Sequence, residues 1–95
     1  MVDIEKRYPE GLRAVLYFLH YMPDVYNEEK YEALSELLKK NYSSGEIERY
    51  RSAVEWALSN LDANFKEIDP GLHQSDVEII FFLKRFKFLC EEKLA

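Results

Sequence analysis

Two Ser-x-x-Glu patterns, at Ser43–Glu46 and Ser75–Glu78, constrain the fold of this chain more than any other feature of its sequence. In such a capping box the serine side chain and the glutamate side chain each accept a hydrogen bond from the other residue's backbone N–H, which starts a helix. Apolar residues at helical spacing follow each box. We therefore predict one long helix through residue 65 and another from residue 76 to about residue 93. The expected core faces are Ile47, Tyr50, Val54, Ala57, Leu58, Leu61 and Phe65 on the first, and Ile79, Phe82, Leu83, Phe86, Leu89 and Cys90 on the second.

Two further helices are expected before these, over residues 9–22 and 27–41. Pro9 suits a first helical turn and Pro23 ends the first helix. Asn27 is a suitable N-cap for the second, whose first turn is acidic and whose last turn is basic, in agreement with the helix dipole. The predicted fold is all-α, a compact antiparallel bundle of four helices that forms a single domain over residues 1–95.

The net charge of −5 argues against binding to nucleic acid or to an anionic membrane surface, because both require clustered Lys and Arg. It is compatible with a basic protein partner, and also with a charge that serves only solubility.

Cys90 is the one cysteine, so the chain has no internal disulfide, and we expect a buried thiol. With no apparent signal peptide at Met1–Glu5 and no apolar run long enough for a membrane span, we expect a cytoplasmic protein.

No pattern of catalytic or metal-binding residues is found. His20 and His73 lack the neighbouring ligands of a zinc site, and the stretch from Asp62 to Asn64 lacks the glycine and final glutamate of a calcium loop. Phosphate-binding loops and nucleophile elbows are also missing. We therefore expect no enzyme activity, no metal and no cofactor, and a function in binding another macromolecule.

The first candidate contact surface is centred on Trp56, which lies opposite the core face of its helix. Tryptophan is common at the centres of protein interfaces, although the N-terminal segment or the loop over residues 65–74 could instead cover this side chain. The carboxylates expected to join Trp56 in this surface are Glu48, Glu55, Asp62, Glu67 and Asp69.

A second candidate surface combines Tyr17 and Tyr21 of the first helix with an acidic stripe on the second. The tyrosines are four residues apart and face away from the expected core, though packing against a neighbouring helix would also explain them. The stripe consists of Glu28, Glu32 and Glu36, which would otherwise be a solvated helix face.

The last helix carries an additional apolar strip formed by Val77, Phe81 and Phe88. This strip is expected either to form the seam of a homodimer or to pack inside the protein, if the last helix is central and touches two neighbours. A homodimeric adaptor or regulatory protein is therefore the alternative function.

The segment SSGEIERYRSAVEWALSNLDANFKEIDPGLHQSDVEIIFFLKRF resembles the second half of small helical immunity proteins of the colicin D and contact-dependent growth inhibition type. The likeness consists of a long helix, an acidic loop and a closing amphipathic helix, without a specific motif. It implies a bacterial toxin inhibitor that binds one-to-one, with carboxylates occupying the basic active-site cleft of a toxin nuclease domain.

Overall fold

The computed structural model describes residues 8–95, and all regular secondary structure in this range is helical. The all-α prediction is therefore confirmed for these residues, while the expectation about Met1–Glu5 concerns residues outside the described range. The elements are α1 (Glu10–Tyr17), the 3₁₀ helix η2 (Phe18–Tyr21), α2 (Glu28–Asn41), α3 (Ser44–Leu58), the short α4 (Phe65–Ile68) and α5 (Asp76–Leu94).

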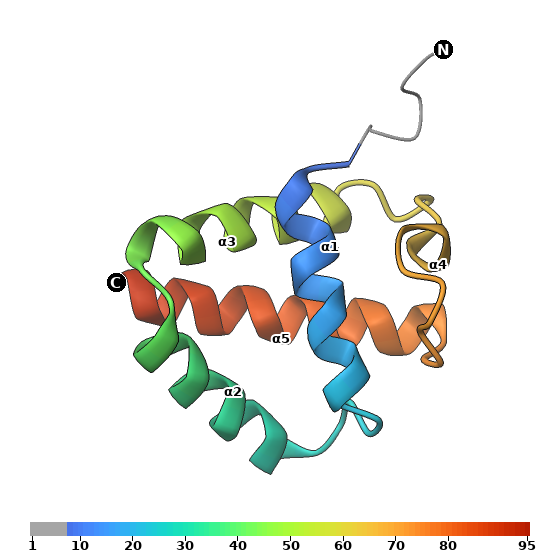
Figure 1. Cartoon of the computed structure of the whole chain (residues 1–95). Helices are drawn as coiled ribbons and strands as arrows, with labels where there is room; N and C mark the ends of the chain where they lie inside the picture. Colours follow the sequence, from blue (N-terminus) through green and yellow to red (C-terminus); the bar gives the residue numbers. More distant parts are fainter. Residues whose placement is uncertain (1–7) are drawn as a thin grey trace.

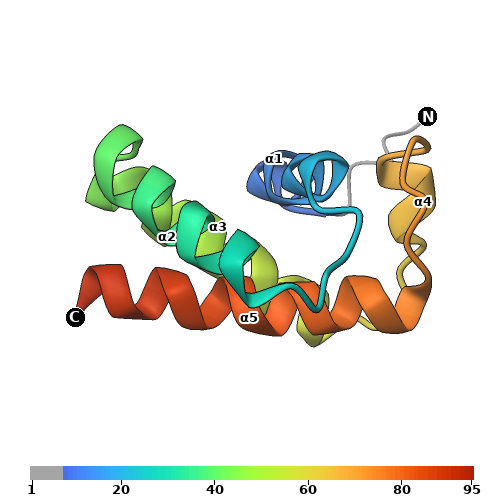
Figure 2. The ribbon, with the colours of Figure 1, turned by 90° about the horizontal axis from the view of Figure 1, so that it is seen from below.

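Helix α5 runs across the middle of the molecule, and α3 lies alongside it in the opposite direction (Figure 1). Helix α1 packs on α3 and crosses α5 steeply, so the antiparallel arrangement holds for α3 and α5 but does not extend to α1. Seen from below, α1 lies on one side of α5, α2 slants toward α5 from that side, and α3 passes behind α5 (Figure 2). The radius of gyration, 12.9 Å, is close to the value of about 13 Å expected for a compact chain of this length.

Both predicted capping boxes form and begin the helices as expected. The Ser43 hydroxyl accepts from the Glu46 N–H at 3.2 Å, and the Glu46 carboxylate accepts from the Ser43 N–H at 2.8 Å. Ser75 and Glu78 repeat this arrangement with the same distances. The Asn27 side chain accepts from the Glu29 N–H at 2.9 Å, which confirms the predicted N-cap of α2.

The predicted core face of α5 is buried in full, and Cys90 is a buried thiol as expected. Burial raises the pKa of Cys90 to about 12. Tyr31 is buried as well, with its hydroxyl donating to the Val25 carbonyl at 2.7 Å, and burial raises its pKa to about 12. The largest fully buried side chains come from α1, η2, α2, α4, α5 and the loop before α2, and they include Leu12, Leu16, Tyr31, Leu38, Phe65, Phe82 and Phe86. Helix α3 adds the buried side chains of Ile47, Ala53, Val54 and Ala57 to the same single core.

The third helix is shorter than predicted, because α3 ends at Leu58. The Asn60 side chain donates to the Trp56 carbonyl at 2.7 Å, and an amide that bonds a terminal carbonyl in this way ends a helix. Leu61 is consequently 52% exposed and not part of the core. Phe65 is buried as predicted, but it belongs to α4, which Asn64 caps.

The first helix also differs from the prediction, because its last turn tightens into η2. The buried Gln74 side chain donates to the carbonyls of Leu19 and Met22 at 2.9 and 3.0 Å, and so supplies partners for the end of this turn. His20 in the same turn lies 2.8 Å from the Asp69 carboxylate. The loop before α5 therefore holds the segment that carries Tyr17 and Tyr21.

Candidate functional site

In the candidate surface around Trp56, several residues already interact with other parts of the protein and are less available to a partner than the sequence suggested. Trp56 is half-buried and packs against the core. Arg51 bonds the Glu48 carboxylate and lies 3.1 Å from the Glu55 carboxylate, so one guanidinium neutralises two of the candidate carboxylates. The hydrogen bond from Arg51 also lowers the pKa of Glu48. The alternative in which the N-terminal segment covers Trp56 involves residues 1–7, which lie outside the described range.

The acidic residues that follow α3 have different surroundings. Asp62 and Glu67 are exposed. The Asp69 side chain is only 14% exposed, since it faces His20 and also accepts from the Gly71 N–H at 3.2 Å. Asp69 thus joins the loop before α5 to η2. Of this group, only Asp62 and Glu67 present an uncommitted carboxylate among residues 8–95.

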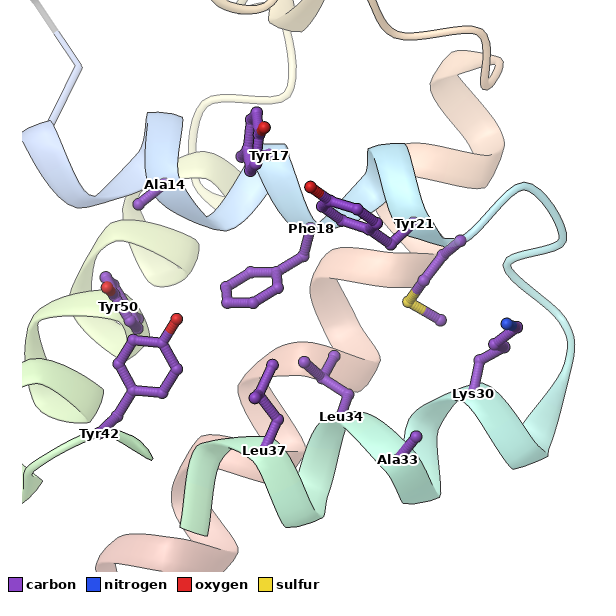
Figure 3. A pocket seen from close by; sticks show the side chains of 11 residues that line it. Ala14, Tyr17, Phe18, Tyr21, Lys30, Ala33, Leu34, Leu37, Tyr42 and Tyr50 are labelled. Atoms are coloured by element: carbon purple, nitrogen blue, oxygen red, sulfur yellow. The ribbon is translucent and has the colours of Figure 1, made fainter. Parts of the chain in front are cut away.

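Tyr17 and Tyr21 are exposed, as predicted, by 56% and 64%, and their rings meet edge to face at 5.8 Å. They form one side of an apolar groove of about 720 Å³, which we call the tyrosine groove (Figure 3). Its other side is α2, and its lining residues are Ala14, Tyr17, Phe18, Tyr21, Met22, Lys30, Ala33, Leu34, Leu37, Tyr42 and Tyr50.

One end of the tyrosine groove is built from packed aromatic rings. The Tyr42 ring lies 5.6 Å from that of Tyr50 and 6.2 Å from that of Phe18, both in edge-to-face geometry. Phe18 in turn packs against Phe86 of the core at 5.6 Å. Burial raises the pKa of Tyr50 above its usual value, so its hydroxyl stays protonated at neutral pH. This end is therefore an apolar wall of packed aromatic rings.

The acidic stripe lies in a different groove, between α2 and α5, which we call the acidic groove. Its volume is about 450 Å³, and its lining residues are Glu28, Tyr31, Glu32, Ser35, Glu36, Arg85, Phe88, Leu89 and Glu92. The structure thus separates Glu28, Glu32 and Glu36 from the two tyrosines with which we had grouped them, because the two sets line different sides of α2.

Within the acidic groove, only Glu28 has a cationic partner. Arg85 donates to both of its carboxylate oxygens, at 2.5 and 2.8 Å, and lowers the pKa of Glu28. The same guanidinium lies over the Tyr31 ring, 4.5 Å from its centroid, which fixes it further. Among residues 8–95, Glu32, Glu36 and Glu92 make no ion pair.

The apolar strip of α5 is interrupted in the middle. Val77 and Phe88 are exposed by 70% and 56%, whereas Phe81 is half-buried. The ring of Phe81 packs against Tyr26 at 4.7 Å and against Tyr31 at 6.5 Å. Helix α5 is therefore the central helix with more than one neighbour, and Phe88 contributes to the acidic groove.

Sequence reasoning missed most of the tyrosine groove. Leu37 is 36% exposed, whereas Tyr31, Leu34 and Leu38 of the same helix are buried, so the apolar residue outside the spacing of these three was the available signal. Tyr42 and Tyr50 come from the other end of α2 and from α3, and nothing in the sequence spacing predicts that Tyr42 packs against both Phe18 and Tyr50. Within residues 8–95, no cluster of three or more His, Cys, Asp and Glu side chains could hold a metal ion. In the same range, no helix has both the length and the apolar character needed to cross a membrane.

Comparison with known proteins gives no family assignment. No protein family model matches the chain, and neither curated proteins nor solved structures include a significant match.

Proposed function

We propose that this chain is an acidic protein-binding domain that inhibits a basic protein partner, in the manner of bacterial immunity proteins that block toxin nucleases. The observation that carries the proposal is the acidic groove, where Glu32, Glu36 and Glu92 lie beside an exposed aromatic side chain, Phe88. Carboxylates around an aromatic anchor are the features that a basic partner would recognise.

The charges of this groove favour a basic partner over a solvated helix face. Arg85, a groove cation, is already engaged by Glu28, so it leaves the other three carboxylates available. Nuclease clefts are positive because they bind phosphates, and carboxylates at suitable spacing can occupy the same positions. Complementary charge would raise the association rate above the ~10⁵–10⁶ M⁻¹s⁻¹ of neutral pairs, and burial of Phe88 would slow dissociation.

The experiment compares two double charge reversals that change the net charge by the same amount. Glu32→Lys with Glu36→Lys alters the acidic groove, and Glu55→Lys with Asp62→Lys alters the first candidate surface near Trp56. All four carboxylates are exposed, so both variants should fold, which circular dichroism checks. Each protein, and the wild type, is immobilised and used to capture partners from a lysate of the native host at low salt.

We expect the wild type and the E55K/D62K variant to retain one basic protein at equal stoichiometry, and the E32K/E36K variant to lose it. The captured protein should have nuclease activity that a molar equivalent of wild-type chain abolishes. Retention by E32K/E36K with loss by E55K/D62K would move the contact to the Trp56 surface. A captured protein without an activity that this chain inhibits would refute inhibition itself.

A homodimeric adaptor is the second candidate, and the exposure of Val77 and Phe88 on α5 favours it. Sedimentation equilibrium separates the two functions before any partner is known. An adaptor of this kind should sediment as a dimer that the double substitution Val77→Glu and Phe88→Glu converts to a monomer. These two positions are better probes than Phe81, because Phe81 packs against Tyr26 and its loss would disturb the fold.

A further inference from the structure

We propose that the tyrosine groove binds a small amphipathic anion, with an apolar body and a single carboxylate that pairs with Lys30. The inference is independent of the acidic groove, because different sides of α2 line the two. It assigns a second binding site, whose ligand has the opposite charge from the proposed protein partner.

The size and lining of the groove favour a small ligand. Its volume of about 720 Å³ lies within the roughly 300–1,000 Å³ typical of small-molecule sites. Its walls are apolar side chains and aromatic rings, with polar groups limited to tyrosine hydroxyls and one ammonium group. Such sites bind the apolar part of a ligand by burial and orient it with a few polar contacts.

The arrangement of the lining gives the groove a direction. Tyr42 and Tyr50 lie at one end, Phe18, Leu34 and Leu37 lie along the middle, and Lys30 stands at the other end (Figure 3). Along α2, Lys30 and Leu37 are seven residues apart, which corresponds to about 10 Å of helix. A ligand of that length would lie along the middle of the groove, with its anionic end beside Lys30 and its apolar end directed toward the aromatic wall.

The charge of Lys30 decides which class of amphipathic ligand fits. It is the one charged residue that lines the groove, and its ammonium group has no ion pair among residues 8–95. A carboxylate would gain a charge-assisted hydrogen bond there, whereas a cationic head group would be repelled.

The test uses decanoate and decan-1-ol as probes, since they share an apolar chain and differ in head-group charge. Binding to the full chain is measured by calorimetry, below the critical micelle concentration of decanoate and below the solubility limit of decan-1-ol. Lys30→Gln removes the cation, and Lys39→Gln is its matched control, an exposed lysine of the same helix that does not line the groove. Ala33→Trp fills the groove from an exposed position and leaves the core intact.

We expect the wild type and K39Q to bind decanoate equally well. K30Q should bind it about tenfold more weakly while binding decan-1-ol as the wild type does, and A33W should lose both probes. Equal decanoate affinity of K30Q and K39Q, or unchanged binding to A33W, would overturn the proposal. So would failure of the wild type to bind decanoate. A third outcome is that neither probe binds the wild type and that A33W no longer retains the captured protein partner. The groove would then bind a helix of that partner and not a small anion. The E32K/E36K experiment tests the proposed function separately.

Discussion

Gln74 connects the loop before α5 to the end of η2, and replacing it with leucine should destabilise the protein measurably. The substitution keeps a similar volume but removes both hydrogen bonds from Nε2. The Leu19 carbonyl retains a bond from the Met22 N–H at 3.0 Å, whereas the Met22 carbonyl loses its side-chain donor. At about 1 kcal/mol for each lost bond, with an added penalty for a buried acceptor without a partner, the free energy of unfolding should fall by roughly 2–3 kcal/mol.

Urea denaturation followed by circular dichroism measures this loss. With a slope of about 1–3 kcal/mol/M, the midpoint should fall by roughly 0.7–3 M. His73→Ala is the control, because His73 is the exposed neighbour of Gln74 and its replacement should change the stability by less than about 0.5 kcal/mol. If Gln74→Leu and His73→Ala unfold at the same urea concentration, Gln74 does not hold the 3₁₀ turn in place.

Three further outcomes follow from the caps, the thiol and one ion pair. Ser75→Ala should lower the free energy of unfolding by about 1 kcal/mol in the same urea assay, because it removes the cap of α5. Cys90 should resist alkylation at pH 8 in the native protein and react rapidly in urea, since burial raises its pKa to about 12; rapid native labelling would contradict this burial. Arg85 lowers the pKa of Glu28 in the folded protein, so the pair stabilises the fold above the ordinary carboxyl pKa of 4.5 and loses this contribution as the pH falls below it. The stability difference between wild type and Glu28→Gln should therefore shrink in acid, which urea titrations from pH 7 to pH 3 would measure.

Local signals in the sequence were sufficient to predict where helices begin. Ser43, Ser75 and Asn27 each cap the helix expected of them, because a cap depends only on residues within one turn. The end of α3 was missed because Leu61 and Phe65 continue its apolar periodicity. Only the bond from Asn60 to the Trp56 carbonyl and the separate packing of Phe65 reveal the break.

The candidate surfaces depended on contacts between helices, which periodicity does not contain. Helical spacing correctly placed Tyr17 and Tyr21 away from the core, and it grouped Glu28, Glu32 and Glu36 on one face. It did not specify which neighbour each face meets. The tyrosine groove requires Phe18 and Tyr42 to approach across the fold, and the acidic groove requires Glu92 to lie opposite α2.

Helix α2 packs mainly against α5, with a groove along each of its sides. An element with so few partners opens at a lower free energy than the rest of a domain, so its amide hydrogens should exchange before those of α3 and α5. Any ligand that fills one groove contacts α2 and suppresses this opening. A ligand bound in either groove would therefore order a wall of the other, which would couple the two grooves through a single helix.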